Sequence, residues 1–226
     1  VIKCISNVLE NEYGNASSTH SYGRSSKSLL ETSRKEIAAH LNVSSSEIIF
    51  TSGGTEADNL VLNSCVRDLG VTRIISSKIE HHAVLYSINE LEKTHGIQVD
   101  FVKLDSNGRV DYQDLERLLK IDDKKTLVSL MHVNNEIGTL LNVKAVSALC
   151  KKYNSYFHSD TIQTMGHYAI DVTSFGADFL TCSAHKFHGP KGIGFLYVNK
   201  DMKLSPMIQG GSQERGMRGG TENITG

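Results

Sequence analysis

Residues 47–56 read EIIFTSGGTE, a β-rich run that ends in a glycine turn. Isoleucine, phenylalanine and threonine favour a strand, and the glycines at 53 and 54 end it. A helical stretch follows from Thr55 and closes near Gly70, a suitable position for a glycine just beyond a helix. The order strand, glycine turn, helix is the repeating unit of an α/β fold.

The same alternation continues outward along the chain. Apolar periodicity and β-branched runs predict strands at 73–76, 98–104, 127–131, 156–160, 179–183 and 194–198, and helices at 26–41, 83–95, 111–119 and 143–153. Residues 105–108 (DSNG) have turn composition. This pattern predicts an α/β domain with a mostly parallel sheet that is covered by helices on both faces.

Composition excludes several classes of partner. With 24 Lys and Arg against 25 Asp and Glu, the 226-residue chain offers no electrostatic case for binding nucleic acid or an anionic membrane. No apolar run is long enough to span a membrane, and residues 1–10 do not resemble a signal peptide. The chain begins at Val1 without Met and stops at Gly226 in mid-pattern, so it reads as a piece of something longer.

Four cysteines, Cys4, Cys65, Cys150 and Cys182, are scattered without a CxxC pair. Neither a disulfide framework nor a metal site is expected from this spacing. Reduced thiols in a cytoplasmic protein are the expectation.

Five polar clusters follow predicted strands: residues 52–55, 80–82, 132–138, 160 and 183–186. In open α/β sheets, ligands bind beyond the carboxyl ends of the strands. We therefore expect the five clusters to converge on one site.

The glycine turn at 52–55 has the features of an anion site. Gly54 lets the backbone approach an anion, the following helix presents free N–H groups, and Thr55 adds a hydroxyl donor. The alternative is an ordinary helix start, with Thr55 as N-cap and Asp58 in the third position of a capping box. The spacing is not that of a Walker loop.

Asp160 ends a strand, and Gln163 lies three residues further on. A carboxylate at the mouth of a sheet could be a metal ligand, a general base or the partner of a cation. The absence of a second carboxylate or histidine at ligand spacing weakens the metal interpretation. Pairing with a protonated ring nitrogen fits, because a buried carboxylate needs a partner.

Residues 183–192 read SAHKFHGPKG and form the most informative stretch. Lys186 lies just beyond a strand, where a lysine beside a bound cofactor can act as a free-amine nucleophile. Ser183 and His185 can reach a phosphate that the same turn surrounds, whereas Lys191 and Lys200 read as surface residues. The His81 imidazole could stack on a planar ring and move protons, whereas His82 is interpreted as a helix-start or core residue.

Taken together, these motifs resemble the cysteine desulfurases of the class V aminotransferase superfamily, which are pyridoxal-phosphate (PLP) enzymes of fold type I. The resemblance is closest to the housekeeping and nitrogen-fixation branch. The matching segments run in the family's order over nearly the whole chain: 14–24, FTSGGTEADN at 50–59, EHHAV at 80–84, MHVNNEIG at 131–138, HSDTIQTMGHYAID at 158–171, SAHKFHGPKGIGFLYV at 183–198 and GGSQERGMRGGTEN at 210–223.

The resemblance implies that residues 1–226 are most of a PLP-binding large domain with a mostly parallel seven-stranded sheet. It also implies a role for each matching residue. Lys186 would form the Schiff base with the cofactor, and His81 would stack on its ring as a second catalytic residue. Asp160 would pair with the ring nitrogen and Gln163 with the phenolic oxygen. The phosphate would be held by Gly54, Thr55, Ser183 and His185, with Thr221 contributed to a neighbouring subunit, and Asn135 would orient the substrate carboxylate.

The implied reaction removes sulfur from L-cysteine and leaves alanine. The sulfur passes to an enzyme cysteine as a persulfide, for iron–sulfur cluster assembly or thiolation. The resemblance further implies a homodimer, because segment 210–223 approaches the neighbouring active site in this family, and a scaffold or sulfur-acceptor protein as partner.

The chain departs from the family in several respects. The loop with the acceptor cysteine, the C-terminal small domain with its carboxylate-binding arginine, and an N-terminal motif are all absent. Ala16 and Gly219 stand where proline and serine are common. Strand alternation turns Cys182 away from the cofactor, and Cys4, Cys65 and Cys150 read as packing residues, so none is expected to be the acceptor.

We expect the chain to bind PLP yet turn over poorly. Alternatives are another class V enzyme, such as a selenocysteine lyase or an aminotransferase, or a truncated inactive form.

Overall fold

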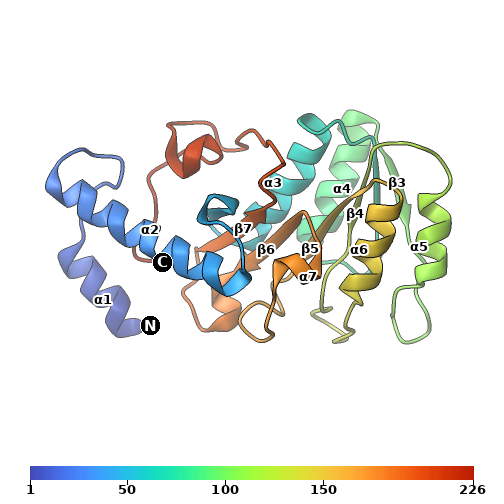
Figure 1. The fold of residues 1–226 in the computed structure, drawn as a ribbon, viewed down its shortest axis with the longest axis horizontal. Helices are drawn as coiled ribbons and strands as arrows, with labels where there is room; N and C mark the ends of the chain where they lie inside the picture. The colour runs from blue at the N-terminus through green and yellow to red at the C-terminus, as the bar shows by residue number, and fades with distance from the viewer.

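The computed structural model describes residues 1–226 and contains one seven-stranded sheet (Figure 1). The strands are β1 (Ile48–Thr51), β2 (Arg73–Ser76), β3 (Gln98–Phe101), β4 (Thr126–Ser129), β5 (Tyr156–Asp160), β6 (Phe179–Ser183) and β7 (Gly194–Val198). Their order across the sheet is β1-β7-β6-β5-β4-β2-β3. Strands β2 to β6 pair in parallel, whereas β7 runs antiparallel to both β6 and β1. The predicted mostly parallel α/β sheet is confirmed.

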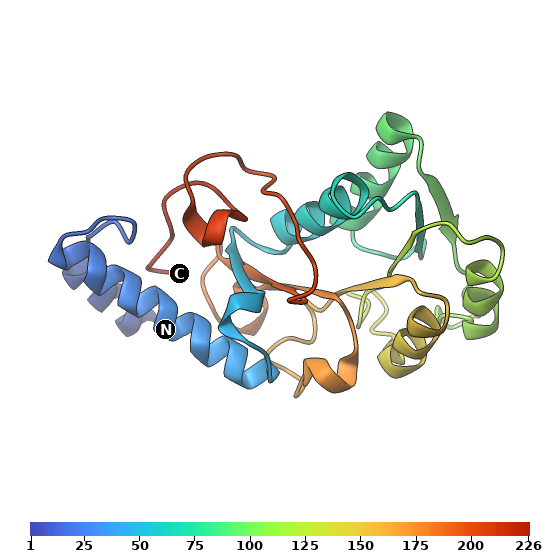
Figure 2. The ribbon, with the colours of Figure 1, turned by 45° about the horizontal axis from the view of Figure 1, so that its top comes forward.

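Helices connect the strands and cover both faces of the sheet (Figure 2). They are α1 (Ile2–Asn11), α2 (Ser21–Leu41), α3 (Gly54–Arg67), α4 (His82–His95), α5 (Tyr112–Leu119), α6 (Val143–Lys152) and α7 (Val172–Phe175), with short 3₁₀ turns η1 (Ser45–Glu47), η2 (Ala184–Phe187) and η3 (Gln213–Gly216). One core of 16 buried residues lies under α3 and α4, and another of 23 lies under α2, α5, α6 and α7. Strands buried on both faces explain why the predicted strands read as continuous apolar runs.

Local signals place most helix ends. Asp111 caps α5 by accepting hydrogen bonds from the N–H groups of Gln113 and Asp114, and Gly96 ends α4 in the left-handed conformation. Strand β3 is shorter than the predicted 98–104. It ends at Phe101, and Leu104 forms only an isolated bridge with Val110.

Strand β4 is also shorter than predicted, Thr126–Ser129 rather than 127–131, and three helices differ from the sequence prediction. Helix α2 begins at Ser21 rather than 26, because the His20 side chain accepts a hydrogen bond from the Gly23 N–H and caps the helix earlier. Helices α1 and α7 were not predicted. Helix α1 has apolar residues at helical spacing, Ile2, Ile5 and Val8, which the prediction passed over, although only Val8 is buried. Helix α7 spans only four residues, too few to show a period.

Candidate cofactor site

The polar clusters that follow the strands are joined by direct contacts. The Glu80 carboxylate accepts a hydrogen bond from the Met131 N–H at 2.8 Å, and the Asn134 side chain donates to the Ile79 carbonyl at 2.6 Å. These contacts join the loops that follow β2 and β4. Their convergence beyond the carboxyl ends of the parallel strands is as expected.

Asp160 lies at the end of β5 with 4% of its surface exposed. Its carboxylate accepts one hydrogen bond, from the Ile162 N–H at 2.8 Å. Burial raises the pKa of Asp160 to about 7; the charge of Asp58 raises it further, whereas the Ile162 bond, His158 and Lys186 act against the rise. A buried carboxylate with so few donors is suited to a cationic partner.

Lys186 lies in the turn η2, directly after β6, and its side chain is exposed. Because β5 and β6 pair in parallel, Asp160 at the end of β5 and Lys186 just after β6 lie at the same end of the sheet. His167 contacts the Lys186 carbonyl oxygen through Nε2 at 2.8 Å and fixes the backbone of the turn. An amine and a carboxylate therefore lie near one another at the same end of the sheet, as the sequence predicted.

His81 is the N-cap of α4, where its Nδ1 accepts a hydrogen bond from the Ala83 N–H at 3.1 Å. Burial, and then the charges of His82 and Lys186, lower the pKa of His81. The ring is thus neutral at pH 7 with Nε2 directed away from the cap, which leaves it able to stack or to move a proton. His82, the first residue of α4, is exposed and stacks on Tyr86 at 4.8 Å between ring centroids, so it starts the helix rather than joining the core.

The glycine turn after β1 lies close to Ser183 at the end of β6. The backbone at Gly53 has a φ of +152°, and a Cβ there would lie 3.6 Å from Ser183 Oγ. A Cβ on Gly54 would lie 2.0 Å from Ile162 Cδ1, so a larger residue there would force the Ile162 side chain to move. Ser183 Oγ lies 2.8 Å from His185 Nδ1. The turn, Ser183 and His185 therefore present donors to one small region, as an anion site requires.

The capping alternative for this turn is wrong. Helix α3 begins at Gly54 with Gly53 as its N-cap and has no side-chain cap. Asp58 is instead fully buried against the sheet, where it accepts a hydrogen bond from Thr181 Oγ1 at 2.8 Å.

The other predicted residues lie in less defined surroundings. Gln163 is half-buried, one turn after Asp160, and Thr55 is exposed on the first turn of α3. Asn135 is exposed and donates only to its neighbour Glu136 at 2.7 Å. Thr221 lines a cavity of about 110 Å³ together with Ser52 and Arg218, and hydrogen-bonds neither Ser183 nor His185. Their proposed roles remain predictions.

Three buried ionisable groups beneath the site were missed by the sequence reasoning. Burial raises the pKa of Asp58 to about 7 and that of Glu80 to about 8, and it lowers the pKa of His158 to about 4. His158 Nε2 lies 3.5 Å from an Asp58 oxygen. His158 precedes Asp160 by two residues, so both side chains lie on the same face of β5, and this alternation was the available signal.

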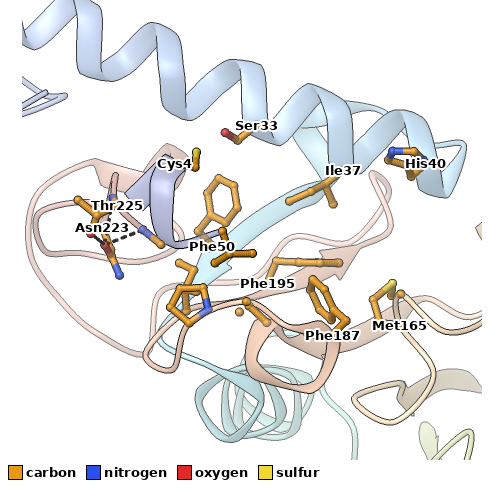
Figure 3. Close-up of a pocket in the computed structure, with 18 of the residues that line it drawn as sticks. Cys4, Ser33, Ile37, His40, Phe50, Met165, Phe187, Phe195, Asn223 and Thr225 are labelled. Carbon is orange, nitrogen blue, oxygen red and sulfur yellow. Dashed lines mark hydrogen bonds between the residues drawn. The ribbon is translucent and has the colours of Figure 1, made fainter. Parts of the chain in front are cut away.

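A mostly apolar cavity borders the turn that carries Lys186 (Figure 3). It has a volume of about 790 Å³, and its walls come from α1, α2, the 165–170 loop, Ala184 and Phe187 of η2, the 189–195 stretch and the C-terminal residues. No lysine, arginine or carboxylate side chain lines it. Cys4 is exposed beside this cavity, contrary to the expectation of a packing residue, whereas Cys65, Cys150 and Cys182 are buried as expected.

Comparison with known proteins identifies the family. The family model described as "Aminotransferase class-V" matches residues 1–226. The chain belongs to this family. It is 44% identical over 228 residues to "Cysteine desulfurase IscS" of Dictyoglomus turgidum, covering 100% of this chain and 57% of the relative. It is 46% identical over 217 residues to "Putative cysteine desulfurase IscS 1" of Bacillus subtilis, covering 95% of this chain and 56% of the relative.

Solved structures of this class V family agree. A "NIFS-LIKE PROTEIN" superposes with a TM-score of 0.94 at 38% identity, covering 100% of this chain and 62% of that one. "SspA in complex with cysteine" superposes with a TM-score of 0.93 at 32% identity, covering 99% of this chain and 65% of that one. The chain thus spans 56–57% of the length of the two curated relatives. No helix has both the length and the apolar character needed to cross a bilayer.

Proposed function

We propose that this chain is the PLP-binding large domain of a cysteine desulfurase, which releases sulfur from L-cysteine and leaves alanine. The observation that carries the proposal is the exposed Lys186 amine beside the buried, donor-poor Asp160 carboxylate. The relatives named as cysteine desulfurases and the related SspA structure with bound cysteine support the choice of substrate.

The residues present fit the cofactor. Asp160 is buried with one hydrogen-bond donor, which leaves it able to pair with a protonated ring nitrogen. The glycine turn approaches Ser183 Oγ closely enough to form a phosphate cradle with His185. PLP, when bound, supplies an aldehyde that reacts with amines and an electron-accepting ring.

The chain's own residues would divide the remaining work. Asp160 holds the proton on the ring nitrogen, and Ser183 and His185 bind the phosphate. The neutral His81 imidazole covers the ring face and excludes water. The Lys186 amine would hold the cofactor and would take up and return the proton at the substrate's α-carbon.

Three of the four cysteines are unsuited to accept sulfur, and the exposed Cys4 lies on α1 rather than in the loops that follow β5 and β6. Burial raises the pKa of Cys65, Cys150 and Cys182, so these thiols stay protonated and inaccessible. We therefore propose that the acceptor cysteine, the homodimer contact of segment 210–223 and the scaffold or acceptor protein belong to the complete cytoplasmic enzyme, and that this chain alone binds PLP but turns over poorly.

Lys186→Ala tests the assignment. The wild-type chain should take up PLP and gain a visible absorption band; borohydride should bleach this band and leave the cofactor covalently attached. The variant should show neither the band nor the covalent attachment. Because Lys186 is exposed, its removal should change the free energy of unfolding by less than about 0.5 kcal/mol. Lys191→Ala is the matched control and should retain the band. A band that survives in Lys186→Ala would contradict the assignment.

A second test separates cysteine desulfurase from other class V enzymes, such as a selenocysteine lyase or an aminotransferase. Alanine release from cysteine in a single turnover, with an added small-molecule thiol to accept the sulfur as a persulfide, supports the desulfurase. Exclusive reaction with selenocysteine, or transfer of the amine to a keto acid, would favour the alternatives. Lack of any PLP uptake would favour a silent binding domain.

A further inference from the structure

The C-terminal segment, residues 210–223, keeps a defined conformation with little regular structure of its own. Its only such element is the short η3 turn, and two consecutive non-glycine residues there have positive φ, 46° at Glu214 and 57° at Arg215. Such backbone persists only where the surroundings impose it. The segment must therefore be held by contacts with the rest of the domain.

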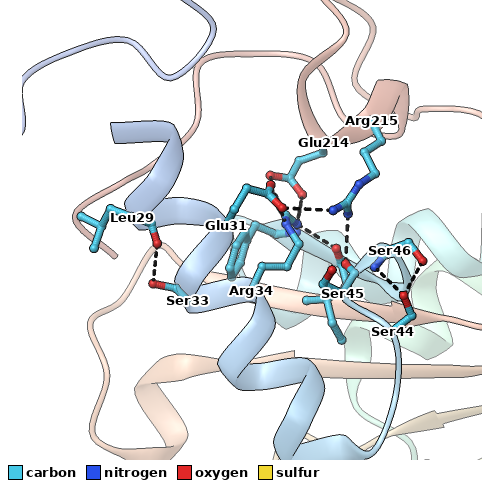
Figure 4. A network of polar contacts seen from close by, with 11 residues as sticks. Leu29, Glu31, Ser33, Arg34, Ser44, Ser45, Ser46, Glu214 and Arg215 are labelled. Carbon is cyan, nitrogen blue, oxygen red and sulfur yellow. Dashed lines mark hydrogen bonds and ion pairs between the residues drawn. The ribbon is translucent and has the colours of Figure 1, made fainter. Parts of the chain in front are cut away.

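The first anchor is a buried ion pair at the edge of the sheet (Figure 4). Arg34 on α2 binds both Glu214 oxygens, at 2.6 and 2.9 Å, and the two side chains are 2% and 3% exposed. Arg34 also donates to the Ile48 carbonyl at 2.7 Å, and Glu214 accepts from the Phe50 N–H at 2.9 Å. Because β1 is an edge strand, the pair replaces the neighbour that this strand lacks.

The second anchor joins the segment to the glycine turn. Glu56 on the first turn of α3 accepts a hydrogen bond from the Ser52 N–H at 2.9 Å, which closes the turn. The same carboxylate binds Arg218 through Nε at 3.0 Å and Nη2 at 3.3 Å. The side chains of Glu56 and Arg218 are 9% and 23% exposed, so water screens this pair only partly.

We propose that Glu56 is a positioning residue that couples the shape of the phosphate-binding turn to the docking of the C-terminal segment through Arg218. The identity of the ligand rests on the proposed function. When the segment is docked, Arg218 holds Glu56 against the Ser52 N–H and the turn keeps its binding shape. When a phosphate fills the turn, it stabilises the docked segment in return, since coupling between two sites is reciprocal.

Arg218→Gln and Glu56→Gln test the coupling with two readouts: amide hydrogen exchange of residues 210–223 and 52–56, and the dissociation constant of PLP. Each variant should speed exchange in both segments and weaken PLP binding by about tenfold, the loss expected for one charge-assisted hydrogen bond. In the wild-type chain, PLP should slow exchange of residues 210–223, and both variants should lose most of this protection.

Arg215→Gln is the matched control. It removes the same charge from the same segment, but Arg215 binds only the Ser45 carbonyl and Glu31. It should change PLP affinity by less than about twofold, the scale of a surface pair.

The coupling is overturned if either variant weakens PLP binding while exchange of residues 210–223 stays at the wild-type rate, or if exchange rises and affinity does not change. An equal loss of affinity in Arg215→Gln would also overturn it, because a general charge effect would then suffice. If the wild-type chain takes up no PLP, the proposed function fails. Exchange in the free proteins still decides whether the Glu56–Arg218 pair holds the two segments.

Discussion

Two buried groups of charges differ in how they are paired. At the edge of the sheet, Arg34 and Glu214 satisfy each other through two hydrogen bonds and also cap β1. Burial alone would lower the pKa of Arg34, but Glu214 raises it above its usual value. Beneath the candidate site, Asp58, Glu80 and Asp160 are equally buried, and burial raises the pKa of each.

The difference in pairing distinguishes charges that stabilise the fold from charges that are suited to bind a ligand. A buried charge that has its partner within the chain is complete and stabilises the fold. Three buried carboxylates with only a few donors and one neutral histidine have no cation in contact, so either protonation or a cationic ligand offsets the cost of burying them. The unpaired group lies where the lysine and the glycine turn converge, which is the place that a cationic cofactor ring would occupy.

Arg34→Met should give the largest effect on stability. The variant leaves the Glu214 carboxylate buried without its partner, and breaking a buried pair in this way costs about 3–5 kcal/mol of unfolding free energy. Urea denaturation measures the loss. The double variant Arg34→Met with Glu214→Gln should recover part of it, and equal losses in the single and double variants would show that the pair is not the cause.

Asp160→Asn should have an intermediate, pH-dependent effect in the free protein. The folded pKa of about 7 lies above the ordinary value of 3.8, so between these values the unfolded chain has released a proton that the native state keeps. The contribution of Asp160 is therefore full below pH 4 and is lost as the pH rises through 7. The variant should gain on the order of 2 kcal/mol relative to wild type between pH 5 and pH 8, at about 1.4 kcal/mol per pKa unit.

Urea denaturation at several pH values measures this difference. Bound PLP should reduce the wild-type pH dependence, because the ring nitrogen supplies the missing cation. A difference between variant and wild type that does not change with pH would mean that Asp160 is already compensated within the chain.

Glu31→Gln should give the smallest effect. Glu31 contacts Arg34 at 3.1 Å and Arg215 at 3.2 Å, but its side chain is 33% exposed, and half-exposed pairs contribute about 0–1 kcal/mol. Urea denaturation should find a loss below about 1 kcal/mol. A loss of unfolding free energy as large as that of Arg34→Met would mean that the part-exposed Glu31 contacts stabilise the fold as much as the buried Arg34–Glu214 pair.

Local signals were sufficient for much of the fold. The predicted bounds of β6 (179–183) and β7 (194–198) match the structure to the residue. Both strands are buried along their whole length, and such strands are easy to recognise in a sequence because they are mostly apolar. Helix ends that depend on a side-chain cap were predicted less accurately. The start of α2 was missed because its cap is His20, and histidine is an uncommon cap.

The sequence by itself determined the strand–helix alternation, the polar residues that end each strand, and hence the edge of the sheet where Lys186 and Asp160 meet. Only the tertiary structure decided which charges are paired. Asp58 looked like a helix-capping residue but is buried against Thr181 of β6, and Glu214 pairs with Arg34, which lies 180 positions away in the chain. Spacing along a chain encodes local hydrogen bonds, whereas burial and long-range pairing arise only when distant elements pack together.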